Sequence, residues 1–202
     1  MGFMFHRGIS GSYRLLGVGR RWYSSENWFK LFPKTFPTGG ATWDVDITQL
    51  RREYRQLQAV HHPDIVANAG SDEDSGMSSK LNKAFSTLLK PVLRSQYLLQ
   101  LQGIDLTNEE VAQGIMQRNP QLLMDVLDVH EQLEELETEE DIKELKGANK
   151  ERIAKLQKAI GAAFGANDWD KAAQLTVELK YWDNLDKAIK EWEPGKPVQL
   201  TH

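Results

Sequence analysis

Residues 49–64 read QLRREYRQLQAVHHPD, and this stretch decides how the N-terminal half of the chain folds. Its apolar residues recur at the spacing of one helical face: Leu50, Tyr54 and Leu57. They predict an amphipathic helix, for which Asp46 is a suitable N-cap. Pro63 is poorly accommodated inside a helix and disfavours helical dihedral angles in the residue before it. The helix is therefore expected to end near His61.

A second helix is predicted to return from the tripeptide His62-Pro63-Asp64. An acidic stretch, residues 72–74, precedes an apolar-periodic segment that begins near Ser78 and reaches Pro91. The buried residues expected in this segment are Leu81, Phe85, Leu88 and Leu89. Three arginines lie off the buried stripe of the first helix and should face water: Arg51, Arg52 and Arg55. A charged helix leading into a short, stiff, polar loop indicates a surface that contacts a partner.

Two other interpretations of these residues are open. The arginines can be an ordinary solvated face, although their place on the helix before the tripeptide favours docking. His61, His62 and Asp64 can alternatively be ligands of a metal-dependent hydrolase. Such a site needs further ligands, and the other histidines lie in an N-terminal leader, a long helix and the last position: His6, His130 and His202. We therefore assign no metal, no cofactor and no enzymatic activity.

Composition limits the possible functions further. The 202 residues suffice for one domain or for two small ones, and no cysteine is available for a disulfide, a thiolate zinc site or a nucleophile. No apolar run approaches the ~20 residues of a membrane span. Residues 26–202 contain 21 basic and 29 acidic residues, a balance that argues against nucleic-acid binding.

Residues 1–25 differ from the rest in carrying four arginines and no acid. This composition, with scattered apolar residues, resembles a mitochondrial transit peptide. The sequence Arg21-Trp22-Tyr23-Ser24 resembles a matrix processing site, which predicts a presequence over residues 1–23 and a mature start near Ser24. The expected location is the mitochondrial matrix, and the alternative is a disordered basic tail.

The remaining chain reads as all-helical, in two units that cover residues 24–103 and 104–202. Pro91 opens a helix that Gly103 closes, and after a short junction four further helices are expected: 108–118, 121–137, a helix capped by Thr138 that runs to about 164, and one capped by Asp168. In the second of these four, a buried seam is predicted: Leu122, Val126, Val129, Leu133 and Leu136. Leu123 and Leu127 lie beside that seam. Tyr181 and Leu185 flank a similar seam in the last helix: Leu175, Leu179, Trp182 and Ile189.

These flanking residues are more apolar than a three-helix core requires. A wide core stripe and an exposed partner site explain them about equally well on residue pattern alone.

Residues 49–91, with QLRREYRQLQAVHHPD followed by KLNKAFSTLLKP, resemble the J-domain of chaperone partner proteins. The resemblance implies that a DnaK-type chaperone docks on Arg51, Arg52 and Arg55. It implies that His62, Pro63 and Asp64 trigger ATP hydrolysis by that chaperone. The role would be allosteric, with differential binding to two states of the ATPase and no chemistry on this chain.

The segments PQLLMDVLDVHEQL, NKERI and QLTVELKYWDNLDKAIKEWEPGK resemble the C-terminal domain of the HscB family, the specialised J-proteins of iron–sulfur cluster biogenesis. The resemblance implies an L-shaped molecule with a C-terminal three-helix bundle that binds an IscU-type scaffold protein. The implied anchors are Leu123, Leu127 and Tyr181, with Leu122, Asp128 and Leu185 as secondary contacts. The zinc-binding cysteine module of some animal members is absent here. A J-protein with a different client is the rival interpretation.

Overall fold

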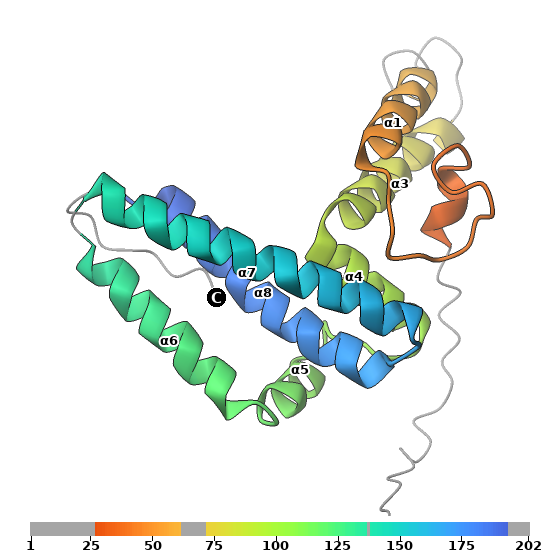
Figure 1. The fold of residues 1–202 in the computed structure, drawn as a ribbon. Coiled ribbons are helices and arrows are strands. Elements are labelled where there is room, and N and C mark those ends of the chain that lie inside the picture. The colour runs from red at the N-terminus through yellow and green to blue at the C-terminus, as the bar shows by residue number, and fades with distance from the viewer. Residues whose placement is uncertain (1–26, 62–71, 137, 194–202) are drawn as a thin grey trace, which may run out of the picture.

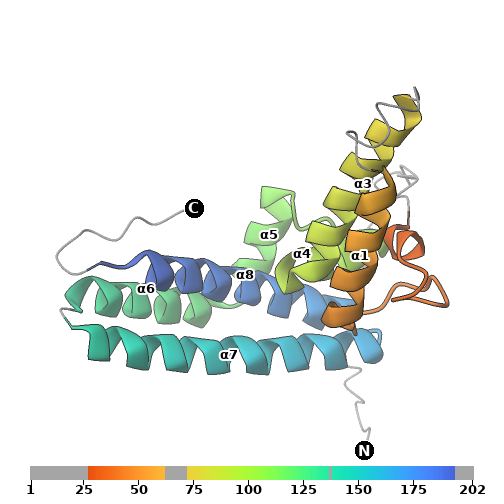
Figure 2. The ribbon, with the colours of Figure 1, turned by 90° about the horizontal axis from the view of Figure 1, so that it is seen from above.

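The computed structural model describes residues 27–61, 72–136 and 138–193, with the backbone alone at 72–75. Within these ranges the chain forms one 3₁₀ helix and α-helices, without a strand: η1 (Trp28–Leu31), α1 (Ile47–His61), α3 (Asp72–Leu89), α4 (Pro91–Leu101), α5 (Glu109–Met116), α6 (Pro120–Glu135), α7 (Glu139–Gly165) and α8 (Trp169–Glu191). The hairpin of α1 and α3 stands at one end of the long α6–α7–α8 bundle and gives the molecule the outline of an L (Figures 1 and 2). The expected all-helical, L-shaped fold is confirmed.

Side-chain caps set most of the helix starts. Asp46 accepts a hydrogen bond from the Gln49 amide at 2.9 Å, and Thr138 and Asp168 cap α7 and α8 as predicted. Helix α4 has no side-chain cap and begins with Pro91. Helix α3 begins at Asp72, before the apolar-periodic segment that starts near Ser78. Successive acidic residues suit the positive end of a helix dipole, so the acidic stretch opens this helix and is not an insert before it.

The smaller of two apolar cores lies within the hairpin and the segment before it. It draws on η1 and the following turn, on α1, on α3 and on α4: Phe29, Phe32, Phe36, Leu50, Leu81, Ala84, Leu88, Tyr97 and Leu98. Tyr54 of α1 stacks on Phe85 of α3 with ring centroids 3.9 Å apart. The predicted apolar faces of both hairpin helices therefore meet each other.

A buried carboxylate ties the N-terminal aromatic segment to α1. Glu53 is only 2% exposed and accepts hydrogen bonds from the Lys34 amide at 2.8 Å and the Thr35 amide at 2.7 Å. The Thr35 hydroxyl donates a third, at 2.7 Å. These donors compensate the cost of burying the carboxylate, so the segment is held against the helix by polar as well as apolar contacts.

The larger core surrounds α8. This helix packs against α4, α5, α6 and α7, and its buried residues are Ala172, Ala173, Leu175, Thr176, Val177, Leu179, Trp182, Leu185, Ala188 and Ile189. The predicted seam of α6 is confirmed for Leu122, Val126, Val129 and Leu133, which are buried, whereas Leu136 is the C-cap residue and is only partly buried. The two cores divide between Leu98 and Leu99, inside α4. Helix α4 thus belongs to both, whereas the sequence-based boundary lies at Gly103.

Candidate functional site

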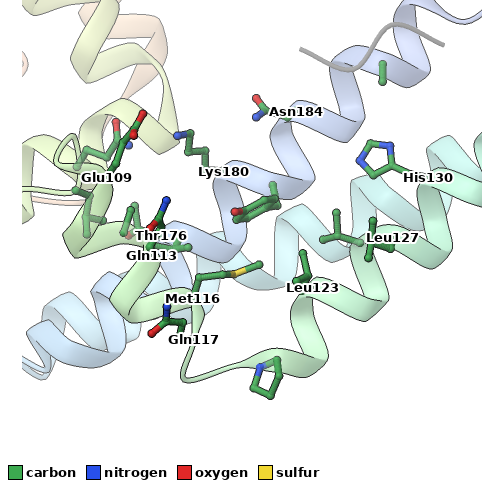
Figure 3. A pocket seen from close by; sticks show the side chains of 18 residues that line it. Glu109, Gln113, Met116, Gln117, Leu123, Leu127, His130, Thr176, Lys180 and Asn184 are labelled. Atoms are coloured by element: carbon green, nitrogen blue, oxygen red, sulfur yellow. The ribbon is translucent and has the colours of Figure 1, made fainter. Parts of the chain in front are cut away.

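A groove with a volume of about 850 Å³ opens among α5, α6 and α8, with Gln96 of α4 at its edge. Figure 3 shows Leu123 and Leu127 pointing from α6 toward α8, and Met116 of α5 extending between the helices. Side chains from three separate helices therefore line one apolar depression. An apolar concavity of this size on a small protein is the usual form of a binding site.

The three residues expected to anchor a partner all line this groove: Leu123, Leu127 and Tyr181. Leu123 is 47% exposed and Leu127 is 53% exposed, although both are aliphatic. Tyr181 reaches the groove from α8 and is partly buried. The tertiary fold thus brings together residues that are more than 50 positions apart in the chain.

Leu122 and Leu185 lie elsewhere. Leu122 is 4% exposed and Leu185 is fully buried, so both are core residues of the bundle. The role of Leu185 as a secondary scaffold contact stays a prediction, and its full burial argues against a direct contact, because α8 has neighbours on several sides and buries more than one seam. Asp128 is exposed on α6 and does not line the groove.

Sequence reasoning missed the contribution of α5 to this site. Ala112, Gln113 and Met116 line the groove, and none of them had been singled out. The available signal was the amphipathic pattern of a short helix, with Val111, Ile115 and Met116 among polar residues. Such a pattern predicts an apolar face but does not show which other helices share it.

His130 stands at the α6 wall of the groove. Its Nδ1 atom is buried and lacks a hydrogen-bond partner among the described residues. Burial lowers the pKa of His130 below its usual 6.5, and the nearby Glu134 carboxylate opposes that shift. The imidazole is therefore neutral at physiological pH, which keeps this wall of the groove free of positive charge.

The exposed surface of α6 is acidic. The helix contains neither lysine nor arginine. Five carboxylates face solvent there: Asp125, Asp128, Glu131, Glu134 and Glu135. This acidic face adjoins the apolar groove on the same helix. A partner that fits it should present apolar side chains close to basic ones.

The second expected surface is on the hairpin. Arg51, Arg52 and Arg55 are exposed on α1, as predicted. His62, Pro63 and Asp64 lie outside the described residues. The presequence expected over 1–23 also lies outside them.

Polar contacts hold α1 and α3 together beside that stretch. Gln58 of α1 donates to the Asn82 side chain at 2.6 Å and accepts from the Ser78 hydroxyl at 2.9 Å. Tyr54 also donates to Asn82, at 2.6 Å. The end of α1 that leads to the tripeptide is thereby fixed against α3.

Among the described residues, no group of three or more histidine and acidic side chains is arranged to hold a metal ion. His62 and Asp64, the alternative metal ligands, lie outside those residues. None of the helices described is both long and apolar enough to cross a membrane.

Comparison with known proteins gives concordant matches. The family described as "HSCB C-terminal oligomerisation domain" matches residues 118–190. The mitochondrial J-type co-chaperone JAC1 of Saccharomyces cerevisiae is 46% identical over 186 residues, which cover 92% of this chain and 97% of the relative. The human iron–sulfur cluster co-chaperone protein HscB is 31% identical over 149 residues, covering 72% of this chain and 62% of that one. A solved structure of the yeast Jac1 co-chaperone superposes with a TM-score of 0.73 at 44% identity, covering 84% of this chain and 98% of that structure.

Proposed function

The chain belongs to the HscB and Jac1 family of J-type co-chaperones of iron–sulfur cluster assembly, and on this premise we propose its partners. It binds an IscU-type scaffold protein through the groove of α5, α6 and α8. It delivers that scaffold to a DnaK-type chaperone in the mitochondrial matrix and stimulates the ATPase of the chaperone through the hairpin. The observation that carries the proposal is the convergence of Leu123, Leu127 and Tyr181 on one groove.

The groove suits a protein partner for physical reasons. Leu123 and Leu127 expose about half of their side-chain surface, which is unfavourable in water and becomes favourable when a partner covers it. A tyrosine at the edge adds a large, rigid contact with a hydroxyl group that can remain hydrated. The acidic face of α6 would then orient a scaffold that carries basic residues beside its apolar contact.

The hairpin supports a second, separate interface. Three exposed arginines on one rigid helix form a charged docking face, and contacts of this kind mainly raise the rate of encounter. A tripeptide with proline at its centre would lose little conformational entropy on binding. Joining both interfaces in one chain raises the effective concentration of scaffold and chaperone toward each other.

The decisive experiment is single-turnover ATP hydrolysis by a mitochondrial DnaK-type chaperone, with this protein present and with or without scaffold. We expect stimulation by the protein, a further rise with scaffold, and loss of both in His62→Gln. Scaffold affinity of His62→Gln should be unchanged, because the described residues that line the groove lie between Gln96 and Ala188. No stimulation of any mitochondrial DnaK-type chaperone would contradict the proposal.

Substitutions in the groove should have the opposite effect. Leu123→Ala with Leu127→Ala, or Tyr181→Ala alone, should weaken scaffold binding by about 1–3 kcal/mol, since each truncates an anchor in the groove. Isothermal titration calorimetry measures this loss, and scaffold-free ATPase stimulation should persist. Met124→Ala is the matched control, because Met124 is 61% exposed on the same helix but does not line the groove.

A J-protein with another client is the second candidate. The exposed arginines of α1 fit it equally well, because they concern the chaperone and not the client. Unchanged scaffold binding in the groove variants, together with normal ATPase stimulation, would favour this candidate.

A further inference from the structure

Trp43 lies in the segment between η1 and α1 but packs against the other unit of the molecule. Its ring stacks on Phe164 of α7 with centroids 5.8 Å apart and an interplanar angle of 21°. The Arg94 guanidinium of α4 lies over the same ring, 4.5 Å from its centroid. Among the residues that the structure describes, Trp43 and Phe164 are the partly buried side chains that pack against both apolar cores. A single indole thus connects the base of the hairpin to the bundle.

Helix α7 is shaped to receive this ring. A Cβ atom at Gly161 would lie 2.8 Å from Cδ1 and 3.0 Å from Nε1 of Trp43, which is too close for any side chain. The other two glycines of α7, Gly147 and Gly165, have no atom within 4 Å of such a Cβ. Glycine is unfavourable inside a helix, so Gly161 has a clear packing reason that Gly147 lacks.

Arg94 adds a further contact to the same ring. It is 6% exposed and donates from Nη1 to the Leu88 carbonyl at 2.7 Å. Burial lowers the pKa of Arg94 to about 10, with Asp44 opposing the shift, so the guanidinium remains charged at neutral pH. A buried cation needs compensation, and the face of the Trp43 ring supplies part of it.

A second tie joins the two units a short distance along α4. The Ser95 and Thr176 hydroxyls share a buried hydrogen bond of 2.5 Å between α4 and α8. Thr176 also donates to the Ala172 carbonyl at 2.6 Å, which sets the direction of the chain of hydrogen bonds. Helix α4 is continuous and contributes residues to both cores. A rotation of the hairpin relative to the bundle would therefore require the contacts between α4 and α8 to be lost.

We propose that Trp43 is a positioning residue, which locks the hairpin at one angle to the bundle so that chaperone and scaffold meet in a productive orientation. The second half of this statement rests on the proposed function. The benefit is physical: two linked interfaces gain effective concentration only where geometry lets both engage at once. A variable angle between the hairpin and the bundle would leave each interface intact but would make simultaneous binding of chaperone and scaffold less favourable.

The orientation of the hairpin relative to the bundle can be followed by site-directed spin labelling, because the chain contains no native cysteine. Spin labels at Ala59→Cys on α1 and Lys150→Cys on α7, both exposed sites, report the distance between the units by pulsed electron paramagnetic resonance. We expect one narrow distance distribution in the otherwise unchanged chain. Gly161→Ala, whose methyl group displaces the ring, and Trp43→Ala should each broaden or shift it.

Two variants control for general damage to the fold. Gly147→Ala adds the same methyl group to the same helix in open space and should leave the distribution narrow. Trp43→Phe retains an aromatic ring that Arg94 and Phe164 can contact and should restore most of the order that Trp43→Ala removes. Unchanged narrow distributions in both Trp43→Ala and Gly161→Ala would overturn the proposal.

The functional arm uses the same variants in single-turnover ATP hydrolysis. The scaffold-dependent rise in rate should fall by roughly an order of magnitude in Trp43→Ala and Gly161→Ala. Scaffold affinity and scaffold-free stimulation should stay at the unmodified level, which a merely misfolded protein would not show. Full scaffold-dependent stimulation despite a broadened distance would overturn the coupling. Absence of stimulation by the unmodified chain would instead overturn the proposed function, and the distance arm would still decide whether Trp43 sets the angle.

Discussion

The charged side chain of Glu53 is almost completely buried. The surrounding donors from Lys34 and Thr35 stabilise it, and the pattern of residues 49–64 could not reveal this. From the helical periodicity alone, Glu53 would be assigned to the solvent-exposed face together with the neighbouring arginines. Its role depends on a turn almost twenty positions earlier, which only the folded chain brings into contact.

We predict that Glu53→Gln lowers the free energy of unfolding by about 1–3 kcal/mol, because it replaces an acceptor oxygen by a donor that faces backbone amides. Chemical denaturation followed by circular dichroism measures the change. Gln56→Ala is the control on the same helix, since exposed Gln56 accepts a single hydrogen bond from the Lys34 ammonium at 2.7 Å. It should shift stability by no more than about 0.5 kcal/mol. Equal effects of both substitutions would refute the role of Glu53.

His130 gives the groove a dependence on pH. Its folded-state pKa lies below 6.5, so the unfolded chain takes up a proton at this position more readily than the folded chain. Stability is therefore unaffected by this group above pH 6.5 and falls as the pH drops from 6.5 toward the folded-state pKa. Protonation would also place a positive charge at the wall of the apolar groove.

We predict that His130→Gln reduces the loss of stability between pH 7.5 and pH 5.5, because glutamine does not titrate. Thermal denaturation of both proteins across this range tests the difference, and subtraction removes the contributions of the other histidines. An identical pH profile for the two proteins would mean that burial of His130 has no thermodynamic effect.

At the scale of elements, α8 shows where periodicity is insufficient. The helical spacing of its apolar residues predicted four core positions, and all four are buried: Leu175, Leu179, Trp182 and Ile189. Leu185, which the same pattern placed on the flank of that seam, is fully buried as well. A helix at the centre of a bundle has neighbours on several sides, so its buried surface is wider than one stripe.

Helix α4 is the element that links the two units. Leu99 belongs to the larger core and Leu98 to the smaller, and Ser95 bonds to Thr176 of α8. We predict that a fragment of residues 91–202 unfolds at a clearly higher temperature than one of residues 104–202, because only the longer fragment keeps α4 on α8. Differential scanning calorimetry makes the comparison. Equal transition temperatures would support a boundary at Gly103.

At the scale of the whole molecule, the two proposed interfaces lie on different arms of the L. The arginines are on α1, and the groove is at α5, α6 and α8 (Figures 1 and 3). The division into residues 24–103 and 104–202 stays a prediction, as do the roles of the tripeptide and of the groove residues. The contacts of Trp43 bear on how these arms are held and therefore on how two partners would meet.

Helix starts, helix ends and the main buried stripes were determined locally. Asp46, Thr138 and Asp168 cap their helices, and Pro91 begins α4, because capping and proline act within a single turn. Motifs of adjacent residues, such as His62-Pro63-Asp64, can be read in the same way. The resemblance to a J-type co-chaperone family was accordingly visible before the fold was known, and the comparisons confirm it.

Contacts between distant segments were decided only by the tertiary structure. The burial of Leu185, the part of α5 in the groove and the close approach of Trp43 to Gly161 each need helices that are far apart in the chain. A periodic pattern states that a face is apolar, but it does not identify what covers that face. Close packing selects the partner helix through the shape of both surfaces, and that shape exists only once the chain has folded.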